Sequence, residues 1–219
     1  AIELYKHHLE VHPDDVGTRR RMVGLYLRSD RLEEAFGEAK HVLEADPNDP
    51  ESLQLLADLA LRTKRTAEGD RILAQLGSLS PGDPENTARV VVVLVHNARG
   101  REAARIADDW AMHHPGALAG SLLAVRAWSA AGVPDSAAAR ARRALAMAPD
   151  STEPRRLLAR ALQDAGHYAE SEREWQALRS MLPGEPGVLL DLGGCRERAG
   201  DIDGAIAAGR DALKLMPDW

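Results

Sequence analysis

The sequence is poor in cysteine, in aromatic residues and in long hydrophobic runs, and each shortage excludes a class of protein. A single cysteine, Cys195, cannot form an intrachain disulfide or a multi-cysteine metal site. Aromatic residues make up 4% of the chain, so a core must be built mainly from Leu, Val and Ala. The longest apolar run, residues 90–95, is far shorter than the ~18 residues that a membrane-spanning helix needs, so we expect no direct membrane insertion.

A basic excess is also missing. The net charge is −6, from 28 basic and 34 acidic residues, whereas nucleic-acid binders usually carry an excess of Lys and Arg; we therefore expect no nucleic-acid partner. The hydrophobic content of 44% and the charged content of 28% are ordinary for a globular protein. Arg is far more frequent than Lys, which we interpret as the coding bias of a GC-rich, bacterial genome. The composition leaves the compartment open between cytoplasm and periplasm.

Proline recurs at a fixed interval. Seven of the 12 prolines are each 34 residues from the last, at Pro13, Pro47, Pro81, Pro115, Pro149, Pro183 and Pro217. A turn-forming Asp, Asn or Gly follows every one of them. Seven prolines in one register exclude coincidence, so the chain is built from internal repeats.

Other positions repeat in the same register. Twelve residues before each proline the side chain is small: Ala1, Ala35, Gly69, Ala103, Ala137, Ser171 and Ala205. Twenty-five residues before the proline it is apolar: Met22, Leu56, Val90, Ala124, Leu158 and Leu192. A position restricted to small residues predicts that two helix backbones approach closely there, because a larger side chain would force them apart.

Between prolines the apolar spacing follows i, i+3, i+4, which predicts two amphipathic helices with a break between them. In the last three units the break contains Gly132, Gly166 and Gly200, again 34 residues apart and suited to ending a helix. Residues 90–95 have strand propensity, but their phase in the repeat predicts a first helix, and we let the repeat overrule propensity.

A 34-residue helix-turn-helix unit with small residues at fixed places and a closing proline resembles the tetratricopeptide repeat. The last unit matches best, through Leu189, Leu192, Gly193, Gly200, Asp201, Ala205, Ile206, Ala212, Leu213 and Pro217. The resemblance implies an all-α solenoid of about 13 helices, wound as a right-handed superhelix. We expect a single array over residues 1–219: 1–15 as the second helix of a truncated repeat, then repeats 16–49, 50–83, 84–117, 118–151, 152–185 and 186–219.

The sequence departs from the family pattern at several positions. The early Trp of the family is replaced by Arg19, Leu53, Thr87, Ser121, Arg155 and Leu189. The second repeat has no turn glycine, and in the third Gly100 falls two residues late. No polar capping helix follows the sixth repeat, which closes at Trp219 after Ile206, Leu213, Leu215 and Met216. The chain also begins at Ala1 inside a helical pattern, so we expect it to be a piece of a longer protein, or its end to pack against something.

Chemical sites are few. His8 and His12 have a spacing that can hold a metal ion, but no third ligand is evident, and a solvated helix end is the better interpretation. Residues 46–50 lack the central Gly and distal Glu of a calcium loop, and Cys195 fits a packed small side chain. No catalytic arrangement or phosphate-binding glycine loop is present. We therefore predict no catalytic residue, cofactor or metal, and a protein that is not an enzyme.

The resemblance implies that the first helix of each repeat lines a concave groove that binds peptides or partner helices. In this sequence the inward positions of repeats three to five are Arg89, Val92, His96, Leu122, Leu123, Arg126, Arg156, Leu157 and Arg160. Family members that bind chaperones hold a C-terminal carboxylate with Lys and Asn at such positions; Asn occurs here only at 48, 86 and 97, none of them inward. Arg mixed with aliphatic residues instead favours an acidic peptide segment, because the guanidinium offers a planar fork to carboxylates.

Three functions are compatible with this pattern. The leading hypothesis is a protein-protein interaction scaffold that binds a partner segment in the groove, within a multiprotein complex. The second is the targeting arm of a larger bacterial enzyme, such as a glycosyltransferase, a sulfotransferase or a membrane-associated protease. The third is a structural homo-oligomer that self-associates through its uncapped ends. Intramolecular pairing of the groove arginines with neighbouring acidic residues is the alternative to a binding role for them.

Overall fold

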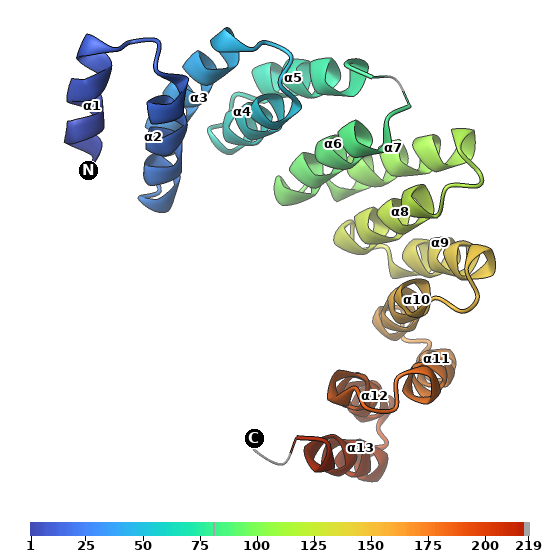
Figure 1. The fold of residues 1–219 in the computed structure, drawn as a ribbon. Helices are drawn as coiled ribbons and strands as arrows, with labels where there is room; N and C mark the ends of the chain where they lie inside the picture. Colours follow the sequence, from blue (N-terminus) through green and yellow to red (C-terminus); the bar gives the residue numbers. More distant parts are fainter. Residues whose placement is uncertain (81, 217–219) are drawn as a thin grey trace. The chain divides into compact units, whose positions relative to one another are not determined.

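The computed structural model describes residues 1–80 and 82–216, and this part of the chain contains thirteen α-helices and no strand (Figure 1). The all-α prediction is confirmed, including residues 90–95, which lie in a helix. Pro81, Pro217, Asp218 and Trp219, to which the repeat assigned turn and closing positions, lie outside the described residues.

The chain divides into two compact units, Ala1–Arg99 and Gly100–Trp219. The first unit contains α1 (Ile2–Val11), α2 (Val16–Arg28), α3 (Leu32–Ala45), α4 (Pro50–Arg62), α5 (Thr66–Ser78) and α6 (Pro84–His96). The second contains α7 (Gly100–His113), α8 (Leu118–Ala130), α9 (Pro134–Met147), α10 (Thr152–Asp164), α11 (Tyr168–Met181), α12 (Pro186–Ala199) and α13 (Ile202–Lys214). The boundary falls inside the predicted repeat 84–117, between its two helices; a single array remains a prediction.

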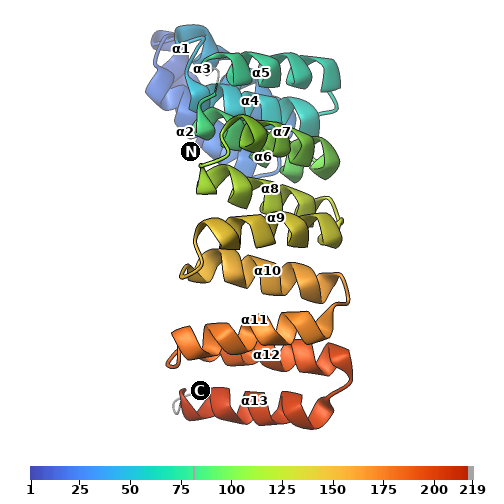
Figure 2. The same ribbon diagram turned by 90° about the vertical axis from the view of Figure 1, so that its right-hand side faces the viewer.

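The helices keep the 34-residue register of the sequence. First helices begin at residues 16, 50, 84, 118, 152 and 186, and second helices at residues 32, 66, 100, 134, 168 and 202. Within each unit, consecutive helices pack against one another, and Figure 2 shows α8 to α13 as roughly parallel rods in a stack. A single hairpin cannot bury its own apolar side, so each hairpin is stabilised by packing against the next one along the chain.

The predicted small column lies where helices meet. Ala35, Gly69, Ala103, Ala137 and Ser171 are all buried, whereas Ala1 is exposed and Ala205 half-buried. A methyl group added at Gly69 would lie 2.7 Å from Leu61 Cδ2, so a larger side chain there would displace Leu61. The six apolar residues from Met22 to Leu192 in the second column are buried as well. The small column therefore marks helix-helix contacts at its five buried positions, as the sequence predicted, and the apolar column lies in the core.

Two tryptophans belong to the core. Trp175 is fully buried and Trp110 nearly so. Trp110 occupies the space that a side chain at position 120 would need, since a Cβ on Gly120 would lie 2.3 Å from the indole ring. Gly120 is thus a close-approach glycine that allows α8 to pack on α7.

The turn between the helices of a hairpin has one geometry throughout. Six residues with positive φ lie 34 residues apart: Asp30 (54°), Lys64 (63°), Ala98 (59°), Gly132 (67°), Gly166 (81°) and Gly200 (86°). The amide that follows each donates to the carbonyl five residues earlier, as at Arg65 N to Ala60 O (2.7 Å) and His167 N to Leu162 O (2.8 Å). This bond closes the last turn of the first helix. The first three repeats therefore keep the turn without glycine.

Gly100, which falls two residues late for the turn, has a different role. It is buried at the start of α7, where an added Cβ would lie 2.7 Å from Ala131 Cα. The turn position of this repeat is Ala98, and Gly100 instead lets α7 approach the end of α8. Within residues 1–80 and 82–216, no helix combines the length and apolar composition needed to cross a bilayer.

Candidate functional site

The candidate site is the exposed side of α8, α10 and α12, the first helices of the second unit, which we call the first-helix face. Figure 1 shows these helices on one side of the unit, with α9 and α11 on the other. The first-helix face comprises Leu122, Leu123, Arg126, Arg156, Leu157, Arg160, Leu190 and Asp191. These residues recur at matching positions of successive repeats, so helical packing places them in register.

Ion pairs connect the three helices across this face. Arg126 of α8 pairs with Glu153 of α10. Arg160 of α10 pairs with Asp191 of α12 at 3.2 Å. Arg156 lies 2.9 Å from Glu185, which precedes α12, and 3.8 Å from the same Asp191.

The arginines predicted to bind a ligand therefore already have carboxylate partners. The partners Glu153 and Glu185 were not part of the sequence-based site, although their spacing from the arginines, close to one repeat, is a signal that could have found them; Asp191 lies at an inward position of the sixth repeat. Arg126 and Glu153 keep 61% and 51% of their side-chain surface exposed. Such solvent-exposed pairs contribute about 0–1 kcal/mol to stability, so they can be exchanged for contacts with a ligand at low cost.

Leucine side chains lie between the arginines. Leu122, Leu123 and Leu157 are half-buried, and Leu190 is 46% exposed. Leu190 was missed as a site residue, although it lies 34 residues from Arg156 and 68 from Leu122. At Gly194, in the same register as Arg126 and Arg160, an added Cβ would contact nothing within 4 Å. The face therefore combines aliphatic surface with ion pairs that contacts to a ligand could replace.

The first unit holds the remaining predicted residues on α6. Arg89 donates to Gln54 Oε1 on α4 at 3.0 Å, while Val92 and His96 are exposed. Asn97 donates to Asp58 Oδ1 at 2.9 Å and so holds α4 rather than facing a ligand. These residues lie in the other compact unit, and we keep them apart from the first-helix face.

The second helices carry their own ion pairs. Arg140 of α9 makes a two-pronged contact with Asp108 of α7, at 2.9 and 2.7 Å, and Trp128 Nε1 donates to the same carboxylate. Arg142 of α9 pairs with Glu170 of α11 at 2.7 Å. Both ion pairs join second helix to second helix, and only the Trp128 indole reaches them from a first helix, α8, so these ion pairs belong to a surface separate from the first-helix face.

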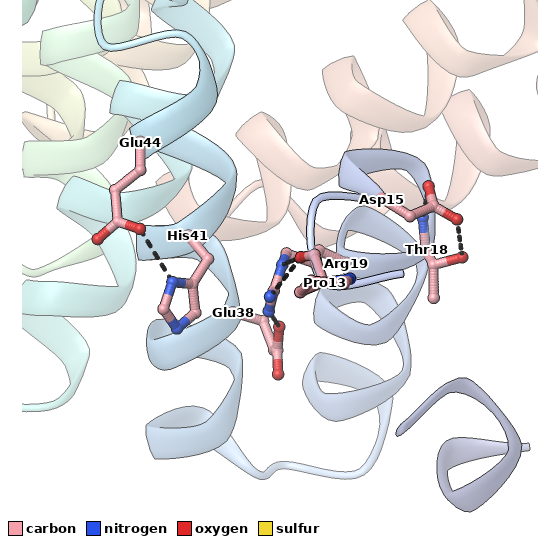
Figure 3. Close-up of polar contacts among 7 residues, drawn as sticks. All are labelled: Pro13, Asp15, Thr18, Arg19, Glu38, His41 and Glu44. Atoms are coloured by element: carbon pink, nitrogen blue, oxygen red, sulfur yellow. Dashed lines mark hydrogen bonds and ion pairs between the residues drawn. The ribbon is translucent and has the colours of Figure 1, made fainter. Parts of the chain in front are cut away.

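The two arginines that replace the family Trp, Arg19 and Arg155, have a shared structural role. In the first unit, Arg19 donates to Pro13 O at 3.1 and 2.7 Å and to Glu38 at 2.8 Å (Figure 3). Four repeats later, Arg155 donates to Pro149 O at 3.1 Å and to Glu174 at 2.7 Å. Each guanidinium thus joins the preceding turn, its own helix and the second helix of its hairpin.

The candidate metal and thiol residues are occupied by other contacts. His8 lies 2.9 Å from Asp15, and its ring centroid is 4.8 Å from that of His12. The described part of the chain contains no group of three or more His, Cys, Asp or Glu side chains placed to hold a metal ion. Cys195 is buried, with its sulfur 3.6 Å from Tyr168 O, and burial raises the pKa of its thiol. It is a packed small side chain, as predicted.

Comparison with known proteins identifies the family. Models of the tetratricopeptide repeat match residues 1–59 and 156–218, which together are more than half of the chain. The chain is a tetratricopeptide repeat protein. Proteins of this family generally act as scaffolds for interactions with other proteins and are typically not enzymes. A comparison with curated protein sequences finds no match.

Several solved structures resemble this tetratricopeptide repeat protein. PilW, a type IV pilus biogenesis factor, has 18% identity and a TM-score of 0.60, over 93% of this chain and 94% of its own. MamA from Desulfovibrio magneticus RS-1 has 17% identity and a TM-score of 0.59, over 77% and 95%. A tetratricopeptide repeat protein from Parabacteroides merdae has 13% identity and a TM-score of 0.60, over 98% and 85%. At these identities the similarity shows the fold alone.

Proposed function

We propose that this protein is a scaffold that binds an acidic, partly apolar segment of another protein along the first-helix face. The observation that carries the proposal is that leucine and arginine side chains lie together on this face, with Leu122, Arg156 and Leu190 at matching positions of α8, α10 and α12. Leu122, Leu157 and Leu190 offer apolar surface, and Arg126, Arg156 and Arg160 offer guanidinium groups close beside it.

The intramolecular ion pairs change how the arginines are expected to attract an acidic ligand. With each arginine opposite a carboxylate, the face is close to neutral rather than strongly basic, so long-range attraction of an acidic ligand is weak. Binding depends instead on short-range exchange, in which a ligand carboxylate takes the place of an exposed Glu or Asp beside an arginine. Two parallel N–H···O bonds to a guanidinium fix the orientation of such a carboxylate.

Leucine contacts supply the rest of the affinity. Covering an exposed aliphatic side chain contributes roughly 25 cal/mol for each Å² of apolar surface removed from water. Leu190 is the most exposed of the leucines that form the face, at 46%. A ligand therefore needs apolar residues spaced to meet leucines on successive first helices, with Asp or Glu between them.

Selection from a random displayed peptide library tests this proposal and requires no assumption about the partner. We expect selected peptides to combine Leu or Ile with Asp or Glu. The double variant Arg126→Glu, Arg160→Glu should weaken their binding at least about tenfold, because it removes two charge-assisted contacts.

Arg142→Glu is the matched control. It reverses an exposed arginine that also pairs with an acidic residue, but between second helices rather than on the first-helix face. Equal losses in the double variant and in the control, or no loss in either, would contradict the proposal. Circular dichroism should show the same helicity for all three proteins.

A further inference from the structure

A pocket lies between α7, α8 and α9 of the second unit. Its volume is about 370 Å³, within the range of pockets that hold small molecules. Most of its walls are small or apolar side chains: Ala111 and Met112 of α7, Ser121 and Ala124 of α8, and Ala139 of α9. The exposed ones, Met112 and Ala139, belong to second helices. The pocket therefore opens between second helices and is separate from the first-helix face.

The pocket exists because side chains that fill this space in the next repeat are small here. Three wall positions hold larger residues 34 residues later, where Ala111, Ser121 and Ala124 correspond to Leu145, Arg155 and Leu158. Leu158 is buried in a core cluster, and Leu145 packs against the same cluster. Arg155 extends as far as Pro149 O, whereas the Ser121 hydroxyl lies 3.6 Å from the sulfur of Met147. The missing side-chain volume leaves a space that helix packing normally fills.

The polar side of the pocket carries one uncompensated positive charge. Arg140 pairs with Asp108 at 2.7 Å, and Trp128 Nε1 also donates to that carboxylate, so these two charges cancel. Arg143, about one turn further along α9, is exposed and has no ion pair or hydrogen bond among residues 1–80 and 82–216. The residue 32 positions earlier supplies the carboxylate for Arg140, but for Arg143 it is Ala111. The guanidinium of Arg143 is therefore available to a ligand.

The geometry points to a binding site for a small monocarboxylate with an apolar body, aromatic or branched aliphatic. The carboxylate pairs with Arg143, whose guanidinium can donate two parallel hydrogen bonds. The body lies against Ala111, Ala124 and Met112, and a methionine thioether makes favourable contacts with aromatic rings. A second negative charge on the ligand would be repelled by Asp108, so the site selects a single one. This site does not depend on the peptide-binding role of the first-helix face.

Ligand-observed NMR with defined compounds tests the site. The probes are 3-phenylpropionate, indole-3-acetate and 4-methylpentanoate, each beside its neutral primary amide, together with acetate. At least one of the three larger carboxylates should bind with a Kd of about 1 mM or lower. Its amide should bind at least about tenfold more weakly, because it lacks the charge-assisted contact with Arg143. Acetate should not bind measurably, because it has no apolar body.

Two variants separate the apolar and the charged parts of the site. Ser121→Leu fills the pocket and should weaken binding at least about tenfold. The matching residues Leu53 and Leu189 are buried in their own repeats, so the fold accepts leucine at this position. Arg143→Gln should weaken carboxylate binding at least about fivefold and leave amide binding unchanged. Arg142→Gln, at the neighbouring exposed arginine outside the pocket, is the matched control and should bind like the wild type.

Circular dichroism checks that each variant is folded. If Ser121→Leu is not, Ala124→Leu fills the same pocket, with the buried Leu158 as its precedent one repeat later. Failure of all three larger carboxylates to bind, equal affinity for acid and amide, or binding that survives the filled pocket in a folded variant would overturn the proposal. Methyl NMR places the bound carboxylate: the signals of Met112 and Ala124 should shift. A shift of Leu190 on the first-helix face in their place would also overturn it.

Discussion

The turn residues show how the repeat determines backbone conformation even where the side chain is unfavourable. Lys64 and Ala98 take φ of 63° and 59°, a region that costs a residue with a Cβ about 1–2 kcal/mol. Gly132, Gly166 and Gly200 take the same conformation without that cost. The two helices of each hairpin and the closing hydrogen bond hold the turn, so the second and third repeats keep the fold at some loss of stability.

Replacing Lys64 by glycine should therefore stabilise the first unit. The Lys64 side chain is exposed and has no partner among residues 1–80 and 82–216, so the change acts on the backbone alone. Relief of the left-handed strain exceeds the extra entropy of glycine in the unfolded chain, which leaves a gain of about 0.5–1 kcal/mol. Urea unfolding measures it. Gly166→Ala is the reverse change and should lose about 1 kcal/mol; a loss at both positions would contradict the account.

Asp15 is the N-cap residue of α2, and its contacts make the stability of the protein depend on pH. The hydroxyl and the backbone amide of Thr18 donate to its carboxylate, at 2.8 and 3.1 Å, and His8 adds a third contact. These bonds favour the ionised form and lower the pKa of Asp15 from 3.8 to about 2. Stability from this group is therefore present above about pH 4 and is lost as the pH falls toward 2.

Thr18→Val isolates this effect. It removes the hydroxyl contact, so the wild type should be more stable than the variant at pH 7. The difference between their free energies of unfolding should become smaller between pH 4 and pH 2.5. The free energy of unfolding in urea, measured across this range, checks it. Thr87→Val is the control, since the Thr87 hydroxyl donates to the backbone carbonyl of Asp83, which does not titrate. A stability difference between the wild type and Thr18→Val that stays constant with pH would refute the explanation.

At the scale of helices, the arginines in place of the family Trp replace an aromatic contact by a polar cross-link. Arg155 and Glu174 keep only 20% and 23% of their side-chain surface exposed. Arg142 and Glu170, by contrast, are both 50% exposed. Removal of water strengthens the attraction between the opposite charges, although Arg155 Nε is buried without a hydrogen-bond partner among the described residues, so the two pairs should differ in strength.

Two double-mutant cycles measure that difference. Alanine replacements of Arg155 and Glu174, singly and together, should give a coupling energy of about 1–2 kcal/mol. The same cycle on Arg142 and Glu170 should give less than about 0.5 kcal/mol. Equal coupling energies in thermal or urea unfolding would show that the buried guanidinium does not hold its hairpin together.

The helices were predictable because their signal is repeated. Apolar periodicity, small residues and prolines recur in one register. This shared register predicts a helix for residues 90–95, although their own composition favours a strand. Intramolecular pairing of the groove arginines was the stated alternative, but the individual ion pairs were not predicted, because each depends on the rotamers of two long side chains on different helices. Glu153 and Asp191 could have been found by aligning the repeats and asking which acid faces Arg126 or Arg160.

At the scale of the whole molecule, the chain holds two compact units, and their boundary at residues 99 and 100 falls inside a repeat. The sequence register continues across this point without a break, so periodicity alone could not predict the division. Each unit buries its own apolar columns and carries its own polar contacts between first helices. The first-helix face lies wholly within the second unit, and the proposed binding function therefore depends on that unit alone.

Methyl NMR of a leucine-labelled sample is the most direct test of the central claim. Addition of a selected acidic, apolar peptide should shift the methyl signals of Leu122, Leu123, Leu157 and Leu190. The signals of Leu145 and Leu178 in the second helices α9 and α11 should stay in place. Shifts confined to the second helices, or spread evenly over both sets, would show that the protein does not bind its partner through the first-helix face.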